Sequence, residues 1–291
     1  MKAEAVSKPH AYHGEGVIWA DDWGGGHAAL RYVDMLAGDV LELQPDDDVR
    51  RFHLGDIAAA LRPRVGGGAV VAVERGFALT RSASFDDIEH TDELWPADHE
   101  PRIRFNDGGC APDGSLYMGS MAYDQSPGAA SMWRLAPDLS TSHVFGAVTV
   151  SNGLWWSPDG TLAYYNDTPT NTIWVFDWSA EVGLTNRRPF ARIEEGAGHP
   201  DGLTVDAEGG VWTALYGGSA VRRYDVDGSL SEVVELGPSQ VTCAAFGGEN
   251  LDRLYITTSQ ENLAPGDEPD AGALFVCTPG VRGQRTLPFE G

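Results

Sequence analysis

Two polar residues, Asn152 and Asp201, occupy equivalent places in two similar segments of the chain. Residues 151–160 read SNGLWWSPDG and residues 200–209 read PDGLTVDAEG, so each polar residue precedes a glycine and a strand-like run. A glycine at such a point lets the backbone turn sharply or approach another segment closely. Carboxylate and carboxamide oxygens presented from equivalent places in a repeat can converge on one hard cation. The pattern therefore predicts a metal-binding site.

The elements that must position these residues are short strands separated by acidic turns. The pairs Asp113-Gly114, Asp159-Gly160 and Glu208-Gly209 each precede a run of apolar and aromatic residues, which is a strand signal. The first two pairs lie 46 positions apart, and the second and third lie 49 apart. One four-stranded propeller blade takes roughly 40 to 50 residues, so the chain accommodates about six blades. We expect an all-β fold, a six-bladed β-propeller.

The same periodicity covers the chain without a clean linker, so we expect residues 1–291 to form one propeller domain. Long amphipathic helical patterns are missing, and residues 56–61 are the one segment that suits a helical turn.

The composition excludes several classes of function. The formal net charge of −23 leaves no basic surface for nucleic acid, which needs Lys and Arg to displace counterions. Lysine occurs only as Lys2 and Lys8, so Schiff-base chemistry and a phosphate-gripping lysine loop are excluded. No long apolar run occurs, so we expect neither a membrane span nor a signal peptide. Three widely spaced cysteines are typical of a reducing compartment, and we expect a cytoplasmic protein.

Four motifs follow one another over nearly the whole chain. They are GEGVIW at residues 14–19, RFNDG at 104–108, SNGL at 151–154 followed by Trp156-Ser157, and PDGL at 200–203 followed by DAEG. With these motifs the chain resembles the family of gluconolactonase, regucalcin (senescence marker protein) and luciferin-regenerating enzyme. The resemblance implies a six-bladed β-propeller with a divalent metal in its central channel and, commonly, hydrolysis of sugar lactones.

The resemblance also implies roles for individual residues. Glu15, Asn152 and Asp201 match the metal ligands, and Asp201 matches the general base as well. Arg104 and Asn106 match the substrate-contacting positions. Such oxygen ligands favour Ca²⁺ as the first choice, with Mg²⁺ and Mn²⁺ next. Zn²⁺ and Fe²⁺ stay open because ligand type alone does not exclude them.

The chain departs from the family's pattern at one substrate-contacting position. After residues 119–122 the family often carries a glutamate, whereas Tyr123 and Asp124 follow here. We expect Asp124 to take the place of that glutamate with a shorter reach, which leaves the substrate preference open.

Each of these residues taken singly also has a simpler explanation. A lone Glu15 on a loop would be a solvated carboxylate, and Asn152 or Asp201 before glycine would be a turn former. Arg104 and Asn106 have a structural salt bridge or an Asx-turn as their alternative. It is the set of motifs together that favours a functional site.

The sequence as a whole predicts a metal-dependent hydrolase that opens an aldonolactone, such as gluconolactone or a pentonolactone. Two other classes of function stay open. One is a different metal-dependent hydrolase, of the organophosphate type, on the same propeller. The other is a non-catalytic, calcium-binding regulatory propeller. The expected partner is a small sugar lactone, with no nucleic acid and no membrane, and the chain is expected to be a monomer or a homodimer.

Overall fold

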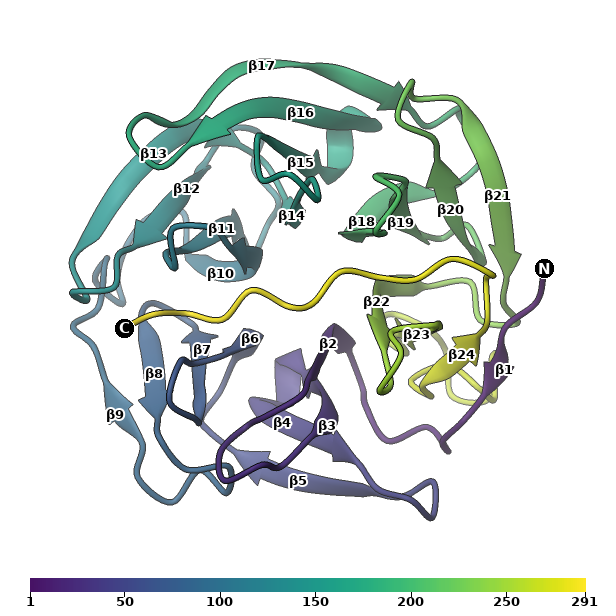
Figure 1. Cartoon of the computed structure of the whole chain (residues 1–291), viewed down its shortest axis with the longest axis horizontal. Coiled ribbons are helices and arrows are strands. Elements are labelled where there is room, and N and C mark those ends of the chain that lie inside the picture. Colours follow the sequence, from purple (N-terminus) through teal and green to yellow (C-terminus); the bar gives the residue numbers. More distant parts are fainter.

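The computed structural model describes residues 1–291 and consists of six antiparallel sheets arranged as a ring of blades around a central channel (Figure 1). Each sheet has four strands. The predicted all-β, six-bladed propeller is therefore confirmed. Helical geometry is limited to two 3-10 turns, η1 (Met35–Ala37) and η2 (Thr168–Thr170). Neither these turns nor any other segment forms a helix of the length and apolarity needed to cross a membrane.

The strands of each blade are given from the channel outwards. Blades 1 and 2 contain β2 (Gly14–Ala20), β3 (Ala29–Asp34), β4 (Asp39–Leu43) and β5 (Val49–His53), then β6 (Ala58–Pro63), β7 (Ala69–Val73), β8 (Phe77–Thr80) and β9 (Glu89–His90). Blades 3 and 4 contain β10 (Ile103–Cys110), β11 (Leu116–Ala122), β12 (Ala130–Leu135) and β13 (Thr141–Val148), then β14 (Ser151–Trp156), β15 (Leu162–Asp167), β16 (Thr172–Ser179) and β17 (Gly183–Arg192). Blades 5 and 6 contain β18 (His199–Val205), β19 (Val211–Tyr216), β20 (Ala220–Tyr224) and β21 (Leu230–Glu235), then β22 (Val241–Gly247), β23 (Arg253–Thr258), β24 (Phe275–Cys277) and β1 (Glu4–Ala5).

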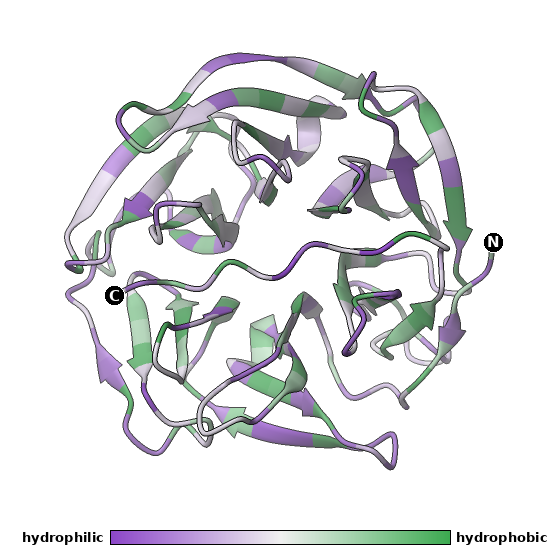
Figure 2. Ribbon diagram, viewed as in Figure 1, coloured by the Kyte–Doolittle hydropathy of each residue, from purple (hydrophilic) through white to green (hydrophobic).

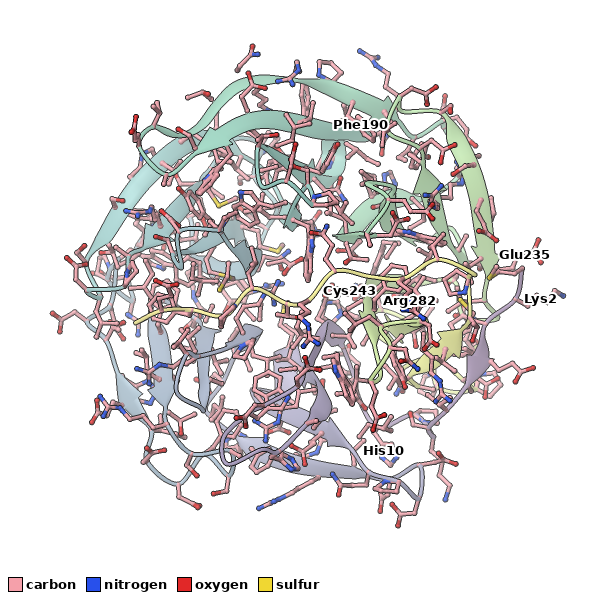
Figure 3. All side chains as sticks on the ribbon, viewed as in Figure 1. Lys2, His10, Phe190, Glu235, Cys243 and Arg282 are labelled. Atoms are coloured by element: carbon pink, nitrogen blue, oxygen red, sulfur yellow. The ribbon has the colours of Figure 1, made fainter.

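The first strand of the chain closes the ring. β1 pairs with β24, so that Glu4 faces Val276 across the ladder, and the blade formed by the end of the chain receives its outermost strand from the beginning. Next to this strand, the Lys2 ammonium lies 4.0 Å from the Glu235 carboxylate on blade 5, as Figure 3 shows at the edge of the ring. Pairing the two ends of the chain in one sheet removes the open edge that an unclosed ring would expose.

The helical turn expected at residues 56–61 is wrong, because residues 58–61 belong to β6. Its three consecutive alanines, at positions 58–60, are all buried in the inner strand. Alanine favours helix in isolation. Here the alanine segment pairs with β7 and packs against β2, where a Cβ added to Gly16 would make an ordinary contact of 3.5 Å with the Ala60 Cα. Strand pairing and burial therefore override the helical propensity of these residues.

Every inner strand is irregular where it pairs with the second strand of its blade. The register shifts at residues 106–107 of β10, 152–153 of β14 and 201–202 of β18, and in β2 it shifts directly after Glu15. Such bulges redirect side chains out of the regular alternation of a strand. Asn106, Asn152 and Asp201 thus lie where the backbone departs from regular pairing, and Glu15 directly precedes such a point.

The glycines that follow two of these residues allow adjacent inner strands to touch. A Cβ on Gly153 would lie 2.3 Å from the Leu203 backbone nitrogen, and a Cβ on Gly202 would lie 2.7 Å from the Cys243 sulfur. Figure 3 shows Cys243 close to the middle of the ring. The prediction that these glycines permit close backbone approach is confirmed.

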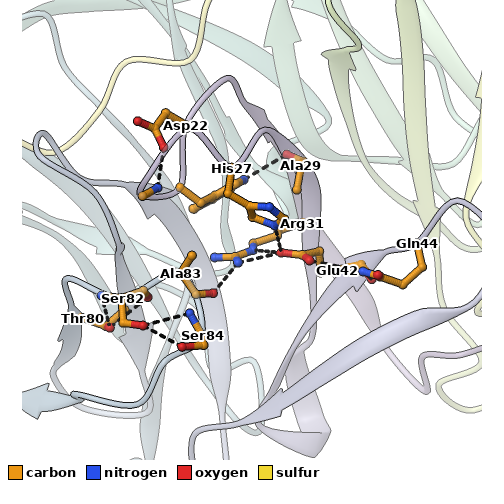
Figure 4. Close-up of polar contacts among 12 residues, drawn as sticks. Asp22, His27, Ala29, Arg31, Glu42, Gln44, Thr80, Ser82, Ala83 and Ser84 are labelled. Atoms are coloured by element: carbon orange, nitrogen blue, oxygen red, sulfur yellow. Dashed lines mark hydrogen bonds and ion pairs between the residues drawn. The ribbon is translucent and has the colours of Figure 1, made fainter.

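A buried arginine fastens blade 1 to blade 2 next to β2 (Figure 4). The Arg31 guanidinium is 4.6 Å from the centre of the Trp23 ring, and its Nε donates to the Glu42 carboxylate at 2.7 Å. Its Nη2 donates to the carbonyl of Ala83, which follows β8 of the next blade. The His27 ring also contacts Glu42, at 3.0 Å. Because the charge is paired inside an apolar interface, the two blades are held in one orientation.

The apolar interior is largest on this side of the ring. A single cluster of 30 buried residues joins blades 1, 2 and 3, and Figure 2 shows hydrophobic residues over most of the strands of blades 1 and 2. This cluster also contains Phe289, which comes from the far end of the sequence.

The last residues of the chain cross one mouth of the channel (Figure 1). This C-terminal strap, residues 281–291, makes polar contacts to all six blades. The contacts join Gly283 to Leu251, Gln284 to Trp156 and Val205, Thr286 to Trp19, Phe289 to Pro63, and Glu290 to Gly114. Gly114 belongs to one of the acidic turns that the sequence singled out, so these turns lie on the face that the strap covers.

We expect the Phe289 side chain to supply most of the strap's apolar stabilisation. It is fully buried, whereas Leu287 in the same strap is 36% exposed. Phe289→Ala should lower the free energy of unfolding by about 3–5 kcal/mol, since the substitution leaves a cavity in a packed cluster. Leu287→Ala is the matched control and should cost about 0.5 kcal/mol or less. Chemical denaturation of both variants measures the difference, and equal losses would show that the strap is not anchored by Phe289.

Candidate active site

The mouth of the channel opposite the strap opens into a cavity of about 450 Å³. The inner strands begin at this cavity and end beneath the strap. Five of the six predicted site residues line it, each from the start of an inner strand: Glu15 on β2, Arg104 and Asn106 on β10, Asn152 on β14 and Asp201 on β18. The propeller thus brings together residues that lie up to 186 positions apart in the sequence.

Two of the lining residues are carboxyl groups buried beside each other. Glu15 is 2% exposed and Asp201 is 5% exposed. Burial raises the pKa of Glu15 to about 8, and the neighbouring Asp107 carboxylate adds to the rise. Burial and the Glu15 carboxylate hold the pKa of Asp201 well above its ordinary value. Both acids are therefore held in an environment that disfavours two negative charges without a cation.

A chain of hydrogen bonds fixes the orientation of the Asn152 amide. The Thr168 hydroxyl donates its only proton to the Pro200 carbonyl at 2.8 Å, so it must accept the bond from Asn152 Nδ2 at 2.7 Å. The Asn152 Oδ1 is thereby turned away from Thr168 and accepts a bond from Asn106 Nδ2 at 3.2 Å. An amide oxygen held in this way is available to a cation without reorganisation.

Arg104 and Asn106 form one rigid unit on β10. Arg104 Nη1 donates to the Asn106 Oδ1 at 2.6 Å and to the Phe105 carbonyl at 2.9 Å. Asn106 Nδ2 donates in turn to the Ser151 carbonyl of the next blade at 2.7 Å. All hydrogen bonds of the guanidinium inside the protein use Nη1, which leaves Nε and Nη2 as donors for a ligand in the cavity.

The donor set suits a hard divalent ion. Nowhere in the structure do three His, Cys, Asp or Glu side chains gather in a metal-binding group, so a site here combines two carboxylates with the amide of Asn152. Ca²⁺, Mg²⁺ and Mn²⁺ prefer oxygen ligands of this kind. A dication between Glu15 and Asp201 would also remove the penalty of burying both as carboxylates. The residues present therefore fit the expected metal.

The structure does not bring Asp124 into the cavity. Its carboxylate is exposed and accepts a bond from the Ser126 backbone N–H at 3.0 Å, which makes it a turn-forming residue. The neighbouring Tyr123 and Gln125 line the cavity instead. The Tyr123 hydroxyl donates to Glu74 at 2.6 Å. The expectation that Asp124 contacts substrate thus has no geometric support, because β11 ends at Ala122 and the chain turns before Asp124.

The cavity also contains polar residues that the sequence did not single out. His13 is buried, and its Nδ1 lies 2.8 Å from the Ser259 hydroxyl and 3.5 Å from a Glu261 carboxylate oxygen. Burial and the positive charge of Arg104 lower the pKa of His13 to about 3. His13 precedes Glu15 by two residues, and residues two apart in an extended chain lie on the same side. This spacing is the signal by which the sequence could have identified His13.

Comparison with known proteins agrees with this arrangement. A family model described as the SMP-30/Gluconolactonase/LRE-like region matches residues 13–260. The chain belongs to this family. The resemblance seen in the four sequence motifs is therefore confirmed.

Members of the SMP-30/gluconolactonase/LRE-like family match the chain over its whole length. A protein of Bacillus subtilis (strain 168) called putative sugar lactone lactonase YvrE is 32% identical, covering 100% of this chain and 99% of its own. Regucalcin of Danio rerio is 31% identical with the same coverage. The crystal structure of a calcium-binding protein, regucalcin, from Agrobacterium tumefaciens has a TM-score of 0.89 and 27% identity, covering 100% of this chain and 98% of that one.

Proposed function

We propose that this protein is a metal-dependent lactonase that opens a polyhydroxylated sugar lactone. The observation that carries the proposal is that Glu15, Asn152 and Asp201 line one cavity together with Arg104 and Asn106. Membership of a family whose name includes gluconolactonase, and similarity to a protein named as a sugar lactone lactonase, support the choice of substrate class.

The proposed chemistry divides the lining residues into two groups, one that would hold a metal ion and one that would orient the substrate. Glu15, Asn152 and Asp201 would hold a divalent ion, which supplies Lewis-acid stabilisation of negative charge on the lactone carbonyl oxygen. Asp201 accepts a proton from the attacking water on its carboxylate oxygen. Arg104 and Asn106 orient the sugar hydroxyls, so that binding energy is converted into alignment of the ester bond.

Ca²⁺ is the first choice of metal in this proposal. The regucalcin from Agrobacterium tumefaciens is described as a calcium-binding protein, and the site offers only oxygen ligands. Mg²⁺, Mn²⁺, Zn²⁺ and Fe²⁺ are the alternatives that reconstitution must compare.

A lactone panel tests the function directly. Protein stripped of metal by a chelator and reconstituted with each ion should hydrolyse glucono-δ-lactone and a pentonolactone, read by acid release, and stripped protein should not. A phosphotriester in the same panel tests the organophosphate-type alternative. Preference for the phosphotriester would replace the lactonase proposal, and metal binding without turnover of any ester would favour a regulatory protein.

The ligand role of Glu15 is tested by its amide variant. Glu15→Gln keeps the size of the side chain but removes one of two negative charges, so we expect Ca²⁺ affinity to fall by at least about tenfold. The rise in melting temperature on adding Ca²⁺ should shrink accordingly, because a ligand that binds only the folded state adds to its stability. Asp124→Asn is the matched control, since it removes a carboxylate outside the cavity. Titration calorimetry would contradict the assignment if the two variants bound Ca²⁺ equally well.

The base role of Asp201 is tested separately from its ligand role. Asp201→Asn keeps one oxygen in place but cannot accept a proton, so metal should remain at least partly bound while turnover falls by about 10² to 10⁴. Steady-state rates are measured at saturating metal, together with metal content. Recovery to near wild-type rates at high metal concentration would show that Asp201 is a ligand only and that the base lies elsewhere.

A further inference from the structure

One carboxyl group in the cavity takes no part in the proposed chemistry. Three acidic residues line the cavity, and two of them, Glu15 and Asp201, are assigned to the metal ion. The third is Glu261, which lies in the loop that follows β23 of blade 6. A charged group that lines a binding cavity without another role is a candidate for contact with the ligand.

The backbone of Glu261 is fixed, whereas its carboxylate is open. The backbone N–H donates to the Ser259 hydroxyl at 2.9 Å, and the backbone carbonyl accepts from Gln240 Nε2 at 2.8 Å. No protein group donates a hydrogen bond to either carboxylate oxygen; the Oε2 lies 3.5 Å from His13 Nδ1. The side chain is 32% exposed. The loop therefore presents to the cavity an acceptor that the protein does not use internally.

Arg104 supplies the complementary group in the same cavity. Its Nη1 makes all of its hydrogen bonds inside the protein, so Nε and Nη2 stay available as donors. No ion pair joins Arg104 to Glu261, although the two side chains carry opposite charges and line one cavity. A guanidinium has only donors and a carboxylate has only acceptors. The cavity thus offers unused donors and unused acceptors that the protein keeps apart.

A hydroxyl group is complementary to both side chains. It can donate its proton to the Glu261 carboxylate and accept a hydrogen bond from Arg104, whereas a carbonyl or ether oxygen can only accept. Because a carboxylate has two oxygens, it can also accept from two neighbouring hydroxyls of one sugar. A hydrogen bond to a charged acceptor is stronger than one between neutral groups. A lactone without hydroxyls would make none of these bonds to Glu261.

We infer that Glu261 is a specificity-determining residue, whose carboxylate accepts hydrogen bonds from substrate hydroxyls and so favours polyhydroxylated lactones over unsubstituted ones. The inference takes its substrate class from the proposed function. The acidic substrate contact that the sequence predicted at Asp124, after β11 of blade 3, is thereby assigned to a loop of blade 6.

Three variants separate hydroxyl recognition from a structural role. Glu261→Ala removes both carboxylate oxygens, and Glu261→Gln keeps one acceptor oxygen without the charge. The loop should keep its conformation in both, because its bonds to Ser259 and Gln240 are made by the backbone of residue 261. Asp124→Ala is the matched control, since it removes an exposed carboxylate outside the cavity.

The measurement compares glucono-δ-lactone with δ-valerolactone, which has the same ring without hydroxyls, on protein of equal metal content. Glu261→Ala should lower kcat/KM for glucono-δ-lactone by roughly 5- to 20-fold, mainly through KM, which corresponds to the loss of one hydrogen bond to a charged group. Glu261→Gln should lose less, and neither variant should change kcat/KM for δ-valerolactone. Equal losses on both lactones in Glu261→Ala, or a larger loss of preference in Asp124→Ala, would overturn the inference.

Binding of the open-chain polyol sorbitol distinguishes failure of this inference from failure of the proposed function. If the wild type hydrolyses neither lactone but binds sorbitol, and Glu261→Ala but not Asp124→Ala weakens that binding, the lactonase proposal fails and recognition of hydroxyls by Glu261 stands. If the wild type and Glu261→Ala hydrolyse glucono-δ-lactone equally well, the lactonase proposal stands and the role of Glu261 fails. Absence of both turnover and sorbitol binding in the wild type overturns both.

Discussion

Six inner strands meet around one axis, and adjacent strands lie so close that a Cβ on Gly153 would overlap the backbone of Leu203. This spacing requires glycine at positions 153 and 202, and the ring brings residues from four different blades to one cavity. Bulges in the same strands turn the polar side chains towards the start of the channel. The site is therefore a consequence of how tightly the ring closes.

Closing the ring in this way costs free energy, because it buries two acidic side chains that line the cavity. Glu15 and Asp201 are almost completely buried, and burial raises the cost of ionising both, with the Asp107 carboxylate adding to it for Glu15 and the Glu15 carboxylate adding to it for Asp201. A protein selected for stability alone would not keep two such acids side by side. The rest of the structure holds them in place through pairing of the first and last strands, the Arg31 anchor between blades 1 and 2, and the strap across the opposite mouth.

The two ends of the channel differ in character because different connections form them. At the strap face three inner strands, β10, β14 and β18, end in tight acidic turns, and the C-terminal residues cover this face. At the cavity face the connections are more varied, and they contribute the η2 turn with Thr168, the segment with Tyr123 and the loop with Glu261. A rigid ring with variable loops at one face is an arrangement that allows substrate preference to change without altering the residues that the inner strands place in the cavity.

The sequence by itself determined the repeat, the number of blades and the residues that carry the motifs, because turn chemistry and strand alternation are local properties. It could not determine the partners of those residues. Asp124 adjoins a cavity residue in sequence but faces solvent, since β11 ends before it, while His13 and Thr168 enter the site without any motif. The three alanines of β6 favour a helix by their intrinsic propensity, but pairing with the neighbouring strand places them in a strand. The tertiary structure decided these points, because they depend on contacts between strands of different blades that no local pattern encodes.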